Sequence, residues 1–125
     1  MALPTISLCS GYGGLELGLE AAGLAVRTVC FVEREAYAAA NLVALMEQGR
    51  LAEAPVWSDL TTFDAKPWAG KVDCLTAGFP CQPFSVAGKR QHTEDERWLW
   101  DDIDRILREL RSIRIVWLEN VPGLA

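Results

Sequence analysis

Short apolar runs alternate with helix-like segments along most of this chain, and that alternation limits the fold more than any other feature of the sequence. A repeated strand–helix pattern is typical of βαβ units, in which helices join parallel strands and pack on the sheet. The sequence therefore predicts an α/β domain built on a parallel sheet. The runs that we expect to form its strands are residues 5–9, 26–32, 56–57, 72–77 and 113–118.

Three segments between these runs have the spacing of amphipathic helices. The first, residues 15–22, has apolar or small side chains at i, i+3, i+4 and i+7 and is expected to end at Gly23. The second, residues 35–48, is rich in alanine and is expected to stop at Gly49, and the third spans residues 95–111. The predicted buried faces are Leu15, Gly18, Leu19 and Ala22 in the first helix, and Leu99, Ile103, Ile106, Leu107 and Leu110 in the third.

Length and composition limit the kind of protein. The 125 residues suffice for one domain, and their net charge of −5 argues against strong nucleic-acid binding by this piece alone, without excluding a local basic loop. No apolar run reaches membrane-span length and no signal-peptide pattern is present, so we expect a soluble cytoplasmic protein with no membrane partner. The four cysteines, Cys9, Cys30, Cys74 and Cys81, lack metal-ligand spacing, so we expect free thiols and no metal.

Polar residues gather where the predicted strands end. Parallel α/β sheets bind ligands beyond the carboxyl ends of their strands, so these residues are candidates for one shared site. They are residues 10–14, Glu33, Asp59, residues 78–85, Glu119 and Asn120.

The glycine-rich turn after the first strand suits a bound cofactor. Gly11, Gly13 and Gly14 let the backbone approach a ligand closely, although a tight turn without a ligand is the alternative. The spacing is not that of a dinucleotide site, and Glu16 at the helix start would repel a pyrophosphate. A cofactor that lacks phosphates and carries an amino-acid end fits better.

Two acids follow the second and third strands. Glu33 occupies the position that accepts ribose hydroxyls in nucleoside-binding sheets, with a solvated strand-end charge as the alternative. Asp59 could accept a hydrogen bond from an adenine amino group, but Ser-Asp is also a common helix cap or turn.

Cys81 is the predicted nucleophile. Pro80 and Pro83 restrict the backbone on both sides of it, which indicates a loop that aims the thiol rather than a buried structural cysteine. Glu119 ends the fifth strand, which is expected to neighbour the fourth, so the thiol and this carboxyl group should emerge side by side. Such a pair suits addition of the thiolate to a ring that must accept electrons. The acid would protonate the ring or donate a hydrogen bond to it while the thiolate adds.

Basic side chains follow the predicted nucleophile. Lys89 and Arg90, with Arg97, could meet phosphates. His92, the sole histidine, is expected on a surface loop rather than as a base, and Trp98 and Trp100 are expected to pack rather than to stack on bases.

These residues resemble the amino-terminal half of the carbon-5 cytosine-specific DNA methyltransferases, which use S-adenosylmethionine. The similarity covers residues 6–123, and its most specific elements are residues 78–85, which read GFPCQPFS, and 119–121, which read ENV. It implies a Rossmann-like S-adenosylmethionine-dependent methyltransferase fold with a truncated parallel sheet of about five strands, in the order 3-2-1-4-5, and a restriction-modification enzyme of bacterial or phage-like type.

The resemblance also implies a role for each matching residue. Cys81 would add to carbon 6 of a cytosine flipped out of duplex DNA, and Glu119 would contact ring N3 and the exocyclic amine. A phenylalanine commonly stands in this family where Cys9 is, so the resemblance implies that an aromatic contact with the adenine is lost. The implied cofactor-binding residues are Cys9, Ser10, Gly11, Tyr12, Gly13, Gly14, Glu33, Arg34, Asp59, Leu60, Gly78, Pro80 and Leu99, and the implied substrate-binding residues are Gln82, Ser85, Lys89, Arg90 and Asn120.

The chain departs from the family pattern in its extent. A later strand with an arginine, a variable recognition region and a carboxyl-terminal segment are absent from the 125 residues, and strand 113–118 would be an open sheet edge. We therefore expect the amino-terminal part of a catalytic domain, truncated or split, which needs a second polypeptide. The alternatives are a non-catalytic cofactor-binding remnant, a tRNA cytosine-5 methyltransferase and, more distantly, a thiol hydrolase.

Overall fold

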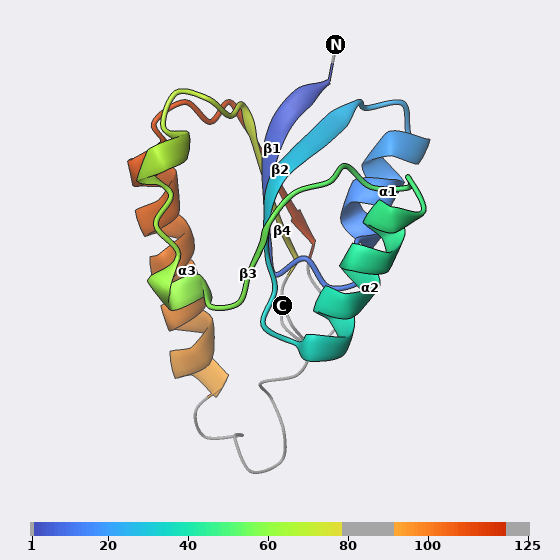
Figure 1. Ribbon diagram of the computed structural model, residues 1–125. Helices are drawn as coiled ribbons and strands as arrows, with labels where there is room; N and C mark the ends of the chain where they lie inside the picture. The colour runs from blue at the N-terminus through green and yellow to red at the C-terminus, as the bar shows by residue number, and fades with distance from the viewer. Residues whose placement is uncertain (1, 79–91, 120–125) are drawn as a thin grey trace.

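A five-stranded parallel sheet forms the centre of the computed structural model, which describes residues 2–78 and 92–119 (Figure 1). The strand order is β3-β2-β1-β4-β5, and every neighbouring pair is parallel, which confirms the predicted order. The strands are β1 (Leu3–Leu8), β2 (Val26–Val32), β3 (Val56–Trp57), β4 (Cys74–Gly78) and β5 (Ile115–Glu119).

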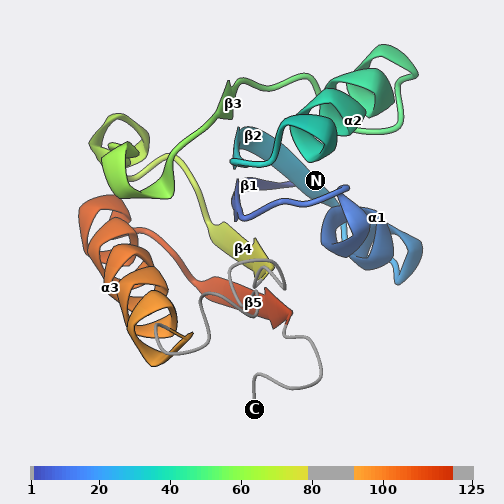
Figure 2. The ribbon, with the colours of Figure 1, turned by 90° about the horizontal axis from the view of Figure 1, so that it is seen from below.

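Helices cover both faces of the sheet. Helices α1 (Gly14–Ala21) and α2 (Ala36–Glu47) lie on one face. Helix α3 (His92–Leu110) lies on the other face, beside the short 3₁₀ helices η1 (Leu60–Thr62) and η2 (Lys66–Trp68), as Figure 2 shows. Among the described residues, no helix is long and apolar enough to cross a membrane.

Alternation along the strands divides the core into two layers. On the α3 side, β1 contributes Ile6 and Leu8, which pack with the α3 residues Ile103, Ile106 and Leu110. Leu99 and Leu107 are partly buried against the same cluster, so the predicted face of this helix is confirmed. On the α2 side, a smaller cluster consists of Phe31, Leu42, Leu45 and Leu51.

Helix α1 departs from the prediction. Its buried residues are Glu16 and Leu19, whereas Gly18 and Ala22, which were expected on the buried face, are exposed. The prediction was wrong because the side of α1 that meets the sheet faces hydroxyl groups, not only apolar side chains.

The other boundaries shift by a few residues. Strand β1 ends at Leu8, so Cys9 lies in the turn, and β4 is displaced toward the carboxyl terminus to include Gly78. Helix α3 begins at His92, so the histidine expected on a loop belongs to a helix. Strand β5 spans Ile115–Glu119 instead of the predicted residues 113–118, so Glu119 is its last residue and not the residue after it.

Strand β5 is the last strand of the sheet as far as the described residues extend. Its side chains Ile115, Val116 and Leu118 are all exposed. A parallel edge with apolar side chains in solvent can accept a further strand.

Candidate functional site

The turn between β1 and α1 has the backbone geometry that a close-fitting loop requires. Cys9, Gly11 and Gly13 all have positive φ angles, of 50°, 58° and 79°. A Cβ at Gly13 would lie 3.2 Å from the Leu51 side chain, so this position has little room for one. The Gly13 N–H donates to the Ser10 carbonyl at 3.1 Å, which closes the turn before α1 begins at Gly14.

Glu33 lies directly beside this turn. Its two carboxylate oxygens accept hydrogen bonds from the Gly11 N–H at 2.6 Å and the Glu35 N–H at 2.7 Å. The acid is therefore fixed rather than freely solvated, and each oxygen retains a lone pair for another donor. Glu33 and the glycine turn form one continuous polar surface at the carboxyl ends of β1 and β2.

Asp59 extends the same rim beyond β3. Its carboxylate accepts from the backbone N–H and the hydroxyl of Thr61, so it caps η1 as the turn alternative predicted. These hydrogen bonds, with a smaller contribution from Arg34, hold the pKa of Asp59 below its ordinary value. The charge of Asp59 is thus maintained next to Arg34, and a role toward adenine stays a prediction.

Arg105 holds η1 in place, and the sequence analysis did not identify it. Its guanidinium donates to the Phe63 carbonyl at 2.7 Å and the Leu60 carbonyl at 3.0 Å, and it pairs with Asp102 and Glu109 on its own helix. The i, i+3 and i, i+4 spacing of these acids was a signal for ion pairs. The contact with η1 could not be read from spacing, because it depends on the position of a distant turn.

Cys9 is close enough to this rim to be affected by its charges. Burial, followed by the nearby Glu33 and Asp102 carboxylates, raises the pKa of the Cys9 thiol to about 12. Cys9 therefore remains a neutral thiol at physiological pH and is no nucleophile.

Gly78 and Glu119 bring the ends of β4 and β5 together. They are partners in the parallel ladder, and a Cβ at Gly78 would lie 3.7 Å from Glu119 Oε1 and 3.0 Å from the Cys9 carbonyl oxygen. The turn after β1, the end of β4 and the Glu119 carboxylate therefore meet at one point of the rim.

The remaining predicted site residues fall into two groups. Tyr12 is exposed, and Leu99 is partly buried against the core cluster on the α3 side of the sheet. The predicted nucleophile Cys81 lies outside the described residues, and so do Pro80, Gln82, Ser85, Lys89, Arg90 and Asn120.

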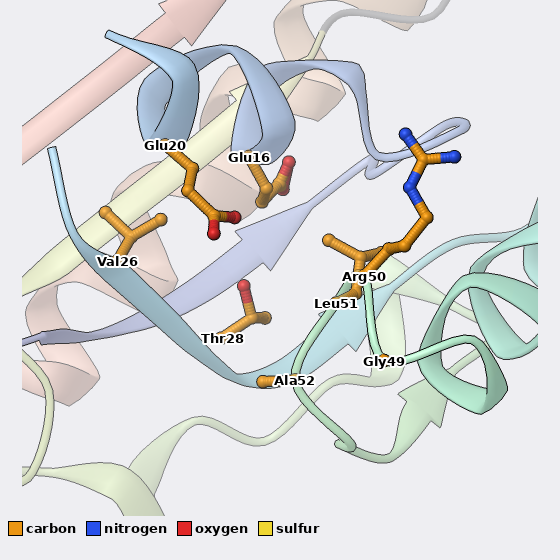
Figure 3. Close-up of a pocket in the computed structure, with 8 residues that line it drawn as sticks. All are labelled: Glu16, Glu20, Val26, Thr28, Gly49, Arg50, Leu51 and Ala52. Carbon is orange, nitrogen blue, oxygen red and sulfur yellow. The ribbon is translucent and has the colours of Figure 1, made fainter. Parts of the chain in front are cut away.

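A cavity of about 210 Å³ lies away from this rim, between α1 and the turn after α2 (Figure 3). It is bordered by Glu16, Glu20, Thr28 and Arg50, among others, and reaches the amino-terminal half of β2. Because parallel sheets bind their ligands at the opposite strand ends, we assign the candidate site to the rim and not to this cavity.

Glu16, which was expected to repel a pyrophosphate at the start of α1, is a buried residue. Its side chain lies against β1 and β4, and burial raises its pKa. Its carboxyl group is therefore buried under the turn rather than exposed on the rim, which weakens the expectation that Glu16 repels a pyrophosphate. The spacing of the glycines in the turn still differs from that of a dinucleotide site.

The sheet and its rim define the class of protein as an α/β methyltransferase. A DNMT2 triple mutant from Spodoptera frugiperda superposes with a TM-score of 0.66 at 26% identity, covering 98% of this chain and 36% of that chain. An S-adenosylmethionine-dependent methyltransferase from Clostridium acetobutylicum matches in fold, with a TM-score of 0.51 at 12% identity over 89% of this chain and 38% of that one.

Within this class the chain belongs to the C-5 cytosine-specific DNA methylase family, whose family model matches residues 3–125. It is 41% identical over 121 residues to the type II methyltransferase M.PspPI of Psychrobacter sp. (strain TA137), a match that covers 96% of this chain and 27% of the relative. A 36% identical match to M.Eco47II of Escherichia coli covers 95% of this chain and again 27% of the relative. The chain thus spans about a quarter of the length of these relatives.

Proposed function

We propose that this chain is the amino-terminal part of the catalytic domain of a DNA cytosine-5 methyltransferase that uses S-adenosylmethionine. The observation that carries the proposal is the meeting of the Cys9–Gly14 turn, Gly78 and Glu119 at one point of the rim, within a chain of this family. In this proposal the turn is the cofactor loop, and the neighbouring Glu119 is the acid that binds the pyrimidine.

The rim fits a methyl donor that has an amino-acid end and an adenosine. Backbone N–H groups of the turn would bind the methionine carboxylate, and the remaining lone pairs of Glu33 would accept the ribose hydroxyls. Arg34, Asp59 and Leu60 lie farther along the rim, where the adenine would extend. S-adenosylmethionine would supply an electrophilic methyl group.

The proposed chemistry needs a nucleophile and an acid on the same pyrimidine. The Cys81 thiolate forms a bond to carbon 6, and Glu119 donates a hydrogen bond at N3, which stabilises the electrons displaced into the ring. Carbon 5, made electron-rich by the addition, would take up the methyl group that S-adenosylmethionine supplies as the donor's methyl–sulfur bond breaks. Loss of the carbon 5 proton to a base restores the double bond and expels the Cys81 thiolate.

A second polypeptide segment is part of the proposal. The exposed β5 edge with Ile115, Val116 and Leu118 would accept a further strand, and that segment would carry the DNA-recognition region. We place this activity in the cytoplasm, where the free thiol expected at Cys81 persists.

A chimera tests the proposal. Residues 1–125 would replace the matching part of M.PspPI, and methyl transfer from labelled S-adenosylmethionine would be measured on duplex DNA and on tRNA. Transfer to DNA that is lost in Cys81→Ala supports the proposal. Transfer to tRNA alone would assign the tRNA alternative, and cofactor binding without transfer to either would assign the non-catalytic remnant.

A further inference from the structure

A chain of hydrogen bonds runs beneath the cofactor turn from β4 to β2. Thr76 Oγ1 donates to Glu16 Oε1 at 3.2 Å, and the Ser7 hydroxyl donates to the same oxygen. Ser7 Oγ lies 2.8 Å from Ser10 Oγ, and Ser10 also bonds the Val32 carbonyl through its N–H at 3.2 Å. Glu16 Oε1 thus links β1 and β4 directly, and it is linked to the turn at Ser10 through the Ser7 hydroxyl.

The sheet register explains why these groups meet. Ser7 and Thr76 are partners in the β1–β4 ladder, so their hydroxyls lie side by side on the face that α1 covers. Glu16 stands in the first turn of α1, above this pair, with only 3% of its surface exposed. Two hydroxyls and an acid from three elements are an unusual content for a sheet–helix contact, where apolar side chains are the norm.

We propose that Glu16 is a positioning residue that ties the cofactor turn at Ser10 to strand β4, and so fixes the position of the turn relative to Gly78. The proposal rests on the proposed function, because it assumes that the turn holds the cofactor. Thr76 precedes Gly78 by two positions and Ser10 directly precedes Gly11, so the linked groups lie next to both halves of the site.

The surroundings of Glu16 favour the uncharged acid. Glu16 Oε2 is buried with no hydrogen-bond partner among the described residues, and an ionised carboxylate in that position would be costly. Burial raises the pKa of Glu16, and Glu119 on β5 adds to the rise while Ser7 and Thr76 oppose it. The other titratable or charged groups facing it are Glu20 on α1, Cys74 on β4 and Arg50 after α2.

The test compares Glu16→Gln and Glu16→Ala with Glu20→Gln, an exposed acid one turn farther along α1. S-adenosylmethionine affinity would be measured by calorimetry between about pH 6 and 9, where an ordinary glutamate is fully ionised. We expect Glu16→Gln, which mimics the protonated acid, to bind within about twofold of the wild type at neutral pH. Glu16→Ala should bind about tenfold more weakly, the loss expected for a removed buried hydrogen-bonding group.

A titration separates positioning from simple packing. The carboxyl carbon of Glu16, assigned in ¹³C-glutamate protein by its absence in Glu16→Gln, should change its chemical shift at a higher pH than the carboxyl carbons of exposed glutamates, because burial raises the pKa of Glu16. An ordinary glutamate titration, equal affinity of wild type and Glu16→Ala, or Glu16→Gln as weak as Glu16→Ala would each overturn the proposal. Wild-type protein that binds no S-adenosylmethionine would overturn the proposed function and this role together, whereas the preceding results would leave the proposed function standing.

Discussion

Gly78 and Glu119 are direct partners at the carboxyl ends of β4 and β5, and a Cβ added at Gly78 would lie 3.0 Å from the Cys9 carbonyl oxygen. Three segments far apart in the sequence therefore converge at the carboxyl ends of the strands.

A side chain at position 78 should disturb this junction. In Gly78→Ala the new Cβ would lie 3.0 Å from the Cys9 carbonyl oxygen, which is backbone and cannot turn away. We expect a loss of about 1–2 kcal/mol in the free energy of unfolding, as for an overpacked core position. Chemical denaturation measures this loss.

The control is Gly18→Ala, because a Cβ at Gly18 meets nothing within 4 Å and the residue lies inside α1. Helix propensity predicts that this variant is more stable by about 0.5–1 kcal/mol. Equal effects of the two substitutions would show that the Cys9–Gly78 contact does not constrain the junction.

Removal of the charge at Glu33 should weaken cofactor binding. Glu33→Gln retains one acceptor oxygen for the Gly11 N–H but loses the charge-assisted bonds proposed to the ribose. We expect S-adenosylmethionine affinity to fall by about ten- to a hundredfold, as for lost hydrogen bonds to a charged group. Calorimetry beside Glu47→Gln, an exposed acid at the far end of α2, provides the comparison. Unchanged affinity would remove Glu33 from the site.

The stability of the protein should depend on pH through Glu16. Because burial raises its pKa above the ordinary value of 4.5, the folded state holds a proton that the unfolded state releases. The contribution of Glu16 is fully present below about pH 4.5 and declines as the pH rises toward the folded-state pKa. Glu16→Gln removes this decline.

Thermal unfolding at a series of pH values measures that effect. The melting temperature of Glu16→Gln minus that of the wild type should increase as the pH is raised above about 4.5. Glu20→Gln, a substitution at an exposed position one turn farther along α1, is the control. A constant difference for Glu16→Gln would mean that Glu16 titrates alike in the folded and unfolded states.

The two arginines of α3 should differ in their effect on stability. Arg105 bonds the carbonyls of Leu60 and Phe63, so Arg105→Ala should cost about 1.5–3 kcal/mol of unfolding free energy and loosen η1. Arg108 pairs with Asp104 at an exposed position, so Arg108→Ala should reduce the stability much less. Denaturation, with hydrogen exchange of η1 amides, separates them, and equal losses would contradict the account.

Apolar periodicity was sufficient to predict the sheet. The alternation predicted all five strands, and the bounds of β2 match the expected residues 26–32. The faces of the strands follow from their two-residue period, so the α3 core was predictable as well. What periodicity could not indicate is a buried acid, since Glu16 reads as an exposed residue on a helical pattern.

The contacts around the site were less accessible to sequence reasoning. Hydroxyls within apolar strands, at Ser7 and Thr76, were a signal for a buried polar group, but they become neighbours only through the β1–β4 pairing. The reach of Arg105 to η1 likewise depends on tertiary structure. The motif residues of the rim were identified individually, whereas their hydrogen bonds to each other required the fold.

The central claim is that Cys81 attacks a cytosine that Glu119 holds. It is tested most directly by trapping the covalent intermediate in the chimera with M.PspPI. Duplex DNA containing 5-fluorocytosine cannot lose a proton from carbon 5, so the thiol cannot be expelled after methyl transfer. We predict a protein–DNA adduct that survives denaturing electrophoresis, that is strongly reduced in Glu119→Gln and that is absent in Cys81→Ala. An adduct of equal yield in Cys81→Ala would contradict the account.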